Sequence, residues 1–257
     1  MILRRLTENL RAQNWTAITI EFLIVVVGVF IGTQVSNWNE GRKERAETRR
    51  MLAQLVPELQ SQLEFFDNTR AYYRTTRRYA DEAFAGWKGD PKISDEQFVI
   101  AAYQASQVTS IALNPDSWSL TFGGEQLRNV QDPRIRRNLE LALTSDYSVV
   151  DLNSVATPYR EKVRHVIPTP VQEAIRRVCG DRNVKGKAGA FVIVLPAQCA
   201  LNLNPAEAAR TAAALRARPD LVEELNWHIA AVAAFRANAA VLELPIRELY
   251  RDLPTSL

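Results

Sequence analysis

The chain has few of the side chains on which most metal sites and many catalytic sites depend. Only two histidines and two cysteines occur among its 257 residues. These residues supply most zinc ligands and many acid–base and nucleophilic groups. The sequence also lacks the G-x-S-x-G, H-E-x-x-H and C-x-x-C patterns. We therefore expect no metal, no cofactor and no enzymatic activity, and we expect His165 and His228 to be structural or surface residues.

The chain also has no large excess of positive or negative charge. The chain has 32 basic and 29 acidic residues, and its net charge is +3. That excess is too small to indicate a nucleic-acid partner. Hydrophobic residues make up 47% of the chain and charged residues 24%, which is ordinary for a folded protein. We therefore expect a folded protein with no nucleic-acid partner.

The most informative feature is a long apolar run near the N-terminus. Phe22 to Ile31 contains no polar residue, and Ala17 to Val35 is long enough to cross about 30 Å of hydrocarbon as a helix. A secretion signal has a shorter apolar core and ends in small residues at the cleavage site. Here the run ends in a poor cleavage site and in Trp38, a residue suited to the membrane–water interface. A buried core helix is disfavoured because charges crowd both flanks.

This run divides the chain into three predicted parts. Residues 1–15 form a short cytoplasmic tail, 16–38 a transmembrane helix in the lipid bilayer, and 39–257 a helical soluble domain on a stalk.

Two signals of orientation conflict. Three arginines precede the run and five basic residues follow it, which favours a cytoplasmic C-terminal domain. Long domains, however, translocate largely regardless of flanking charge. Cys179 and Cys199 could close a disulfide in an oxidising compartment, or they could remain two buried free thiols. We predict a periplasmic domain. The basic residues are Arg4, Arg5 and Arg11 before the run, and Arg42, Lys43, Arg45, Arg49 and Arg50 after it.

Small residues recur along one face of the predicted transmembrane helix. Gly28 and Gly32 form a G-x-x-x-G pair, and Ser36 continues the row. Such a row lets two helices approach closely. Glu21 lies seven residues before Gly28, on roughly the same face, where a carboxylate is costly unless it is paired or reaches the interface. The row predicts packing against a second transmembrane helix, in a homo-oligomer or with another inner-membrane protein, unless the glycines are incidental.

Beyond the run, the apolar spacing is that of helices. Leucines and aromatics recur every three, four or seven residues up to Trp87, with Pro57 expected to kink or divide that helix. Further helices are predicted to begin at Ser94, Asp132, Pro170, Asn204 and Pro219, and the one from Asp132 to continue past Pro158 towards His165.

Little strand is expected. Asp181 to Gly189 is predicted to be a polar loop, and Phe191 to Leu195 is the one strand candidate. The predicted fold is mainly α: a transmembrane helix continuing into an elongated helical bundle, with at most one short strand or hairpin near 190–196.

An arginine stripe is the strongest candidate for a binding surface. Arg70, Arg74, Arg77 and Arg78 share one helix face. The stripe could bind an anionic ligand, lipid headgroups or an acidic partner. The alternative is a solvated face paired with nearby acids such as Asp67 and Asp81, which is what a run of charges usually means.

Two stretches resemble a family of uncharacterised bacterial single-pass membrane proteins. The first is EFLIVVVGVFIGTQVSNWNEGRKER, in which Glu21 precedes the apolar span. Asn37, Trp38, Asn39 and Glu40 are similar to that family's motif N-x-W-N-E, but without the residue between Asn and Trp. The second is Trp118 to Leu143, which is similar to that family's glycine-containing turn and charged helix. It departs from the pattern at Gly123-Gly124, where a polar residue and one glycine are more usual. The resemblance implies a membrane anchor, a helical domain and no known reaction, and we expect the bacterial inner membrane.

Two classes of function remain open. The first is a non-catalytic interaction or scaffold protein that assembles with itself or as an accessory subunit of an inner-membrane complex. The alternative is a ligand-sensing periplasmic module that signals through a partner.

Overall fold

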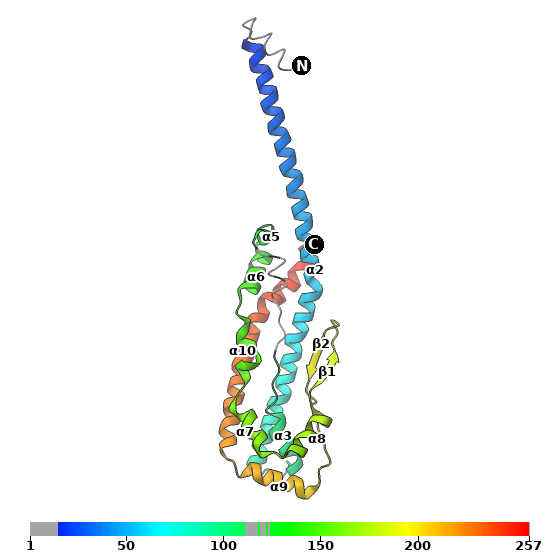
Figure 1. Cartoon of the computed structure of the whole chain (residues 1–257), viewed down its shortest axis with the longest axis vertical. Helices are drawn as coiled ribbons and strands as arrows, with labels where there is room; N and C mark the ends of the chain where they lie inside the picture. Colours follow the sequence, from blue (N-terminus) through cyan, green and yellow to red (C-terminus); the bar gives the residue numbers. More distant parts are fainter. Residues whose placement is uncertain (1–14, 111–117, 119–121, 123, 257) are drawn as a thin grey trace. The chain divides into compact units, whose positions relative to one another are not determined.

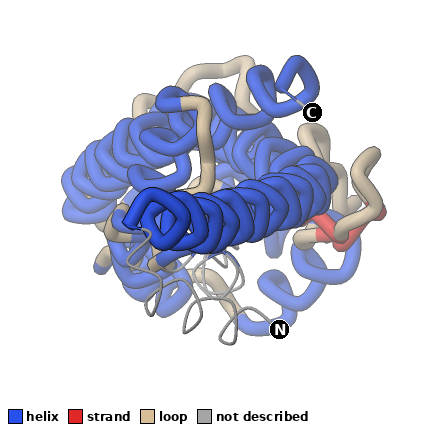
Figure 2. The backbone as a smooth tube through the Cα atoms, turned by 90° about the horizontal axis from the view of Figure 1, so that it is seen from above, coloured by secondary structure: helices blue, strands red, loops and turns tan. Residues whose placement is uncertain are grey.

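The protein is mainly α-helical, as the sequence predicts. The computed structural model describes residues 15–110, 118, 122 and 124–256. The predicted tail before Trp15, and Gly123, lie outside these residues. Helices make up most of the described chain, and its strands form a single hairpin (Figure 2). The α-helices are α2 (Trp15–Trp87), α3 (Asp95–Gln104), α5 (Glu125–Arg128), α6 (Pro133–Thr144), α7 (Pro158–Val166), α8 (Thr169–Cys179), α9 (Pro205–Arg216) and α10 (Asp220–Ser256).

Of the two effects expected at Pro57, a kink or a division, the division is wrong, because α2 continues through this residue. A proline removes one backbone hydrogen bond. The buried Leu55 and Leu59 on either side stabilise the helix through tertiary packing. The chain divides into two compact units, Met1–Met51 and Leu52–Leu257, which are described separately below.

The second unit is built on the part of α2 after residue 51 and on α10. These two helices run beside one another, with α6 and α7 against α10 and with α9 across their ends (Figure 1). Tyr73 of α2 packs edge-to-face on Phe235 of α10, with ring centroids 5.3 Å apart. Both rings are fully buried, and such pairs add to the free energy gained from burial alone.

The helix starts follow the predicted capping signals. Ser94 forms a capping box with Gln97, in which each side chain bonds the other's backbone N–H. Asp132 caps α6 by accepting from the backbone of Arg134, and Asn204 caps α9.

The predicted helix from Asp132 to His165 is wrong, because α6 ends at Thr144. Two 3₁₀ turns, Tyr147–Val150 and Leu152–Val155, separate it from α7. Asp146 and Asp151 accept hydrogen bonds from the backbone of Ser148 and Ser154. Such local bonds compete with a continuous helix, and they end it here.

The hairpin corrects the predicted loop at Asp181 to Gly189. Strand β1 (Arg182–Lys185) lies within that segment and pairs antiparallel with β2 (Phe191–Val194). β1 is too polar to be recognised alone, and its pairing with the apolar β2 makes it a strand.

Polar side chains of α2 hold the hairpin against that helix. Glu64 accepts hydrogen bonds from the backbone N–H groups of Lys187 and Ala188, and Asn68 donates to the carbonyl of Ile193. A Cβ at Gly186 would lie 2.5 Å from the Glu64 carboxylate, so a side chain there would displace that carboxylate from its present position.

We predict that Glu64→Ala frees the hairpin turn without unfolding the domain. The two backbone donors would lose their carboxylate partner and bond water instead. Hydrogen exchange at residues 186–188 should accelerate at least tenfold, while the melting temperature changes little. Glu82→Ala on the same helix is the matched control and should leave this exchange unchanged. Unchanged exchange in Glu64→Ala would show that the carboxylate does not hold the turn.

Candidate functional site

The first unit presents an apolar helical surface that none of the described residues covers. Large apolar side chains from Ile20 to Trp38 are exposed, and none of the most apolar window of this helix is buried. The segment from Ile18 to Trp38 spans about 31 Å as a helix. It is therefore a candidate membrane span by length and composition.

The predicted packing residues lie within this span. Gly28 and Gly32 are exposed, and a Cβ added to either would meet no atom within 4 Å. Ser36, which continues the row, is exposed as well. One carboxylate oxygen of Glu21 is shielded and has no hydrogen-bond partner in the described chain. The row is thus open to an approaching helix.

The end of the span has an interfacial arrangement. Trp38 is exposed, and the guanidinium of Arg42 lies 5.2 Å from the centre of its ring. An aromatic ring next to a cation suits the boundary between hydrocarbon and headgroups.

The predicted arginine stripe is largely occupied by partners from the second unit. Arg77 pairs with Asp81 at 2.8 Å, and Arg78 donates to the carbonyl of Ala197. Arg70 pairs with both Asp67 and Glu243. Of the four arginines, Arg74 alone has no ion-pair partner among the described residues.

Arg70 belongs to an ionic contact between α2 and α10. Its partner Glu243 is buried and also pairs with Arg247. Burial alone would raise the pKa of Glu243, but the bonds from Arg70 and Arg247 outweigh it and lower that pKa. Glu243 therefore stays ionised, and Arg70 is needed to stabilise it.

A cavity of about 210 Å³ lies between α2 and α10. Tyr73, Ala105 and His228 line it and are buried. The exposed Arg77 and Arg236 belong to its lining. Arg236 has no partner in the described chain, so a cationic group stands at the edge of an apolar space.

His228 is the buried titratable group of this cavity. It is 2% exposed, its Nδ1 lies 2.8 Å from the hydroxyl of Thr157, and its ring stacks on Tyr159. Its Nε2 is buried without a well-formed hydrogen bond. Burial, reinforced by the nearby charge of Arg160, lowers the pKa of His228 to about 4, so the imidazole is neutral at pH 7.

A second cluster, absent from the sequence predictions, lies where α3, α7 and α8 meet. Arg160 donates to the carbonyl of Ser106 at 2.7 Å, and the guanidinium of Arg164 lies 4.9 Å from the ring centre of Tyr103. Burial and the charge of Arg160 lower the pKa of Arg164. These arginines come from a helix that begins after an unpredicted break, so their convergence could not be read from spacing.

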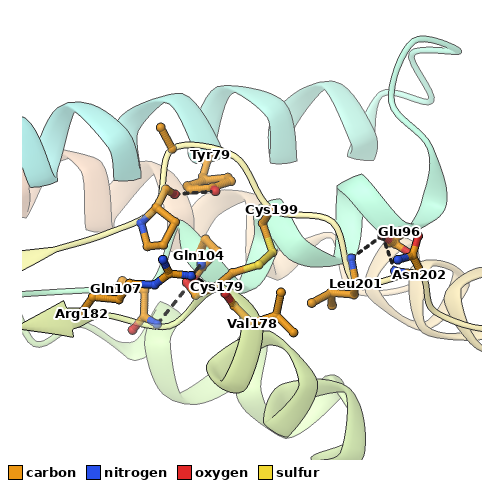
Figure 3. The surroundings of a disulfide bond; sticks show 12 residues. Tyr79, Glu96, Gln104, Gln107, Val178, Cys179, Arg182, Cys199, Leu201 and Asn202 are labelled. Carbon is orange, nitrogen blue, oxygen red and sulfur yellow. Dashed lines mark hydrogen bonds between the residues drawn. A yellow bond between two sulfur atoms is a disulfide. The ribbon is translucent and has the colours of Figure 1, made fainter.

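Cys179 and Cys199 form a disulfide that joins the end of α8 to the segment after the hairpin (Figure 3). The bonded cysteines are 20 residues apart in sequence. Closing a loop of that size stabilises a fold by about 3 kcal/mol in the chain-entropy model. Gln104 of α3 donates to the carbonyl of Cys179 at 2.6 Å and so fixes this end of the bridge.

The segment after Cys199 is held by one carboxylate. Glu96 of α3 accepts hydrogen bonds from the backbone N–H groups of Leu201 at 2.9 Å and Leu203 at 2.7 Å (Figure 3 draws the first). Asn202 between them adopts a positive φ of 55°. The disulfide and Glu96 together determine the path into α9.

The outer face of α10 carries a stripe of exposed apolar residues. The sequence alone did not show that these residues are exposed. Val241, Trp227 and Leu244 are 72%, 62% and 59% exposed. Alanines 230, 234 and 237 lie exposed between them. The helix as a whole is long and apolar enough to cross a membrane by length and composition, but its opposite face belongs to the core.

The comparisons with known proteins add no relatives: no protein-family model, curated protein or solved structure matches this chain. Among the described residues, no group of three or more histidine, cysteine, aspartate or glutamate side chains could hold a metal ion.

We predict that His228 makes stability depend on pH. Its folded pKa of about 4 lies below the ordinary value of 6.5, so the unfolded chain binds the proton first. The stabilisation is complete above pH 6.5 and falls by about 1.4 kcal/mol per pH unit towards pH 4, roughly 3 kcal/mol in all.

Denaturant titration of the detergent-solubilised chain from pH 7 to pH 4 measures this dependence. His228→Asn, whose amide can still accept from Thr157, should lose less stability than the natural chain. His165→Asn, at an exposed position, is the control and should follow the natural chain. A constant difference between the natural chain and His228→Asn across this range would contradict the prediction.

Proposed function

We propose that this chain is a membrane-anchored, non-catalytic interaction protein, held in the bacterial inner membrane by residues 16–38. The uncovered apolar surface from Ile18 to Trp38 is the observation that supports it most directly. Exposing such a surface to water is unfavourable at about 25 cal/mol per Å². A bilayer removes this cost along the whole length of the segment.

The second unit is proposed to lie in the periplasm. The Cys179–Cys199 disulfide supports this location, because structural disulfides persist in oxidising compartments. The basic residues after the span argue for the cytoplasm. A long translocated domain tolerates such flanks.

A non-catalytic role is supported by three carboxylates that are engaged in contacts within the fold. Glu64 holds a turn, Glu96 holds a loop, and Glu243 joins two helices. The open row of Gly28, Gly32 and Ser36 offers a surface to another transmembrane helix. The resemblance in residues 21–45 points to the same anchored architecture.

Thiol accessibility and membrane extraction test this proposal. We predict that the full chain stays in the membrane fraction after alkaline carbonate washing. A membrane-impermeant maleimide polymer should add nothing to intact spheroplasts, and should add two tags once a reductant is present. A Cys179→Ser/Cys199→Ser variant is the control and should take none.

Two outcomes would overturn it. Recovery of a soluble chain that begins after Trp38 would exclude the anchor. Thiols that react only after the inner membrane is opened, without any reductant, would exclude the periplasmic location.

The cavity between α2 and α10 favours ligand sensing as a second candidate function. Its volume of about 210 Å³ suits a small molecule with few carbons. Its apolar walls, together with the unpartnered Arg236, suit a short-chain carboxylate whose head lies at that guanidinium. A signal from this site would pass through a partner protein.

We predict that hexanoate at millimolar concentration raises the melting temperature of the detergent-solubilised chain, because a ligand that binds the folded state stabilises it. Arg236→Gln should remove at least half of the shift, while Arg210→Gln on the exposed face of α9 should leave it intact. Absence of any shift, or an equal shift in Arg236→Gln, would reject the site.

A further inference from the structure

Three arginines converge where α7 and α8 meet the end of α3. Arg160 and Arg164, one helical turn apart on α7, both donate to the side-chain oxygen of Gln107, at 3.1 and 3.2 Å. Arg176 of α8 donates to the hydroxyl of Tyr103 at 3.4 Å, and the guanidinium of Arg164 lies 4.9 Å from the centre of the same ring. We call Arg160, Arg164 and Arg176 the arginine cluster.

The acceptor that Arg160 and Arg164 share is held in place by hydrogen bonds of its own. The amide nitrogen of Gln107 donates to the side chain of Gln104 at 3.3 Å, and Gln104 donates to the carbonyl of Cys179 at 2.6 Å. The oxygen of Gln107 is therefore left to accept from the two arginines. A neutral amide, and not an acid, positions these two guanidinium groups, so their charge stays available to a ligand.

The charge of the arginine cluster is not neutralised within the described part of the chain. No ion pair joins any of the three arginines to a described carboxylate. Asp181 is near enough for its charge to act on Arg160 and Arg164, but its carboxylate accepts from Tyr72 at 3.0 Å. Burial, followed by the charges of Arg160 and Arg176, lowers the pKa of Arg164. The three cations therefore repel one another more than Asp181 compensates.

The arginine cluster also has more hydrogen-bond donors than acceptors. Each guanidinium carries five N–H groups. Arg164 and Arg176 each make one side-chain hydrogen bond to a described residue, and the Nε of Arg164 is buried without one. Arg176 is exposed and the other two are half-buried, so the cluster can be reached from water. Charged donors in excess, close together and accessible, are the features of an anion site.

The number and arrangement of the charges decide which anion fits. A single carboxylate has one charge and two oxygens in a plane, which cannot neutralise three guanidinium groups that approach from two helices. A tetrahedral oxyanion with two charges offers acceptors in several directions, and arginine binds such groups through paired N–H donors.

We propose that the arginine cluster binds a small, doubly charged tetrahedral oxyanion, either phosphate or sulfate. Its oxygens would accept from Arg160, Arg164 and Arg176. None of the three lines the cavity beside Arg236, so this site is distinct from the one considered there for a carboxylate. The proposal does not depend on the membrane anchor.

Thermal unfolding of the detergent-solubilised full chain tests the site. Sodium phosphate and sodium sulfate are titrated separately at about pH 8, where phosphate carries nearly two charges. Sodium chloride at equal ionic strength is the reference. Phosphate, sulfate or both should raise the melting temperature beyond the chloride reference, because an anion that binds the folded state stabilises it. The anion with the lower dissociation constant is then the better candidate for the natural ligand.

Neighbouring arginines of α8 provide a matched pair of variants. Arg176→Gln should weaken binding about tenfold, because it removes one charged donor. Arg177→Gln, exposed next to it, should bind the anion as the natural chain does. This control also accounts for the general stabilisation of proteins by phosphate and sulfate at high concentration. Arg236→Gln should likewise keep the response, which separates the cluster from the cavity.

Stability without the anion distinguishes a binding site from a structural cluster. In chloride buffer of low ionic strength, Arg176→Gln should melt at the same temperature as the natural chain or higher, because it relieves repulsion between like charges. A group that only stabilised the fold would give a lower melting temperature and an unchanged response to both anions.

Three results would overturn the proposal: no shift beyond the chloride reference with either anion, equal weakening in Arg176→Gln and Arg177→Gln, or the structural pattern just described. None of them bears on the proposed function. The chain's resistance to carbonate washing tests the membrane anchor separately, and only loss from the membrane would overturn that anchor.

Discussion

The contact between α2 and α10 decides which surfaces the second unit leaves for other molecules. Glu243 is buried, and a buried carboxylate is tolerated only when it is paired. Arg70 supplies that pairing from α2, and Tyr73 packs on Phe235 further along the same two helices. These two contacts fix the rotation of α10 about its own axis. With this rotation, the exposed apolar residues of α10, among them Trp227, Val241 and Leu244, point away from the core. The cavity beside His228 remains because the short side chains between the two helices do not fill the space there.

The exposed apolar surface of residues 20–31 and that of α10 differ in how their apolar residues are distributed around the helix. This difference indicates which kind of partner each surface suits. In the first unit, residues 20–31 expose large apolar side chains around the helix. A surface without a preferred side suits hydrocarbon, which has no shape of its own. The exposed apolar residues of α10 occupy one side only and recur every three and four residues; they are Trp227, Ala230, Ala234, Ala237, Val241 and Leu244, half of them alanine. Such a surface gains little from lipid but allows close packing with a helix of the same spacing. Both helices are long and apolar enough to cross a membrane, but one face of α10 is buried in the core whereas the first unit's helix is exposed on all sides of its most apolar part.

The sequence predicted those features that short-range chemistry determines. Ser94, Asp132 and Asn204 cap helices because their side chains reach backbone groups two or three residues away. Features that depend on distant partners were missed. Strand β1 exists because β2 pairs with it, and Arg70 is occupied by Glu243, which lies 173 residues further along the chain. The break between α6 and α7 was missed because apolar spacing continues through it, although Asp146 and Asp151 were visible local signals. On α10 the apolar residues cover two faces, and spacing alone cannot say which of them meets the core.

The cavity and the exposed apolar face of α10 share a physical origin, which bears on how the two candidate functions relate. Alanines 233, 237 and 240 border a further hollow of about 320 Å³ beside Phe66 and Arg70, and Ala237 is also one of the exposed apolar residues of α10. Short side chains at these positions leave the space between α2 and α10 incompletely filled. They also project little from the outer face of α10, so another helix could approach its backbone closely. A helix seated on this face would therefore lie at the edge of the same hollow. Any molecule that filled the hollow and moved α10 relative to α2 would change the surface offered to that helix, because packed helices shift as rigid bodies. A ligand in the hollow and a helix on the outer face of α10 would thus act on the same part of the fold, which the ionic contact between Arg70 and Glu243 holds to α2.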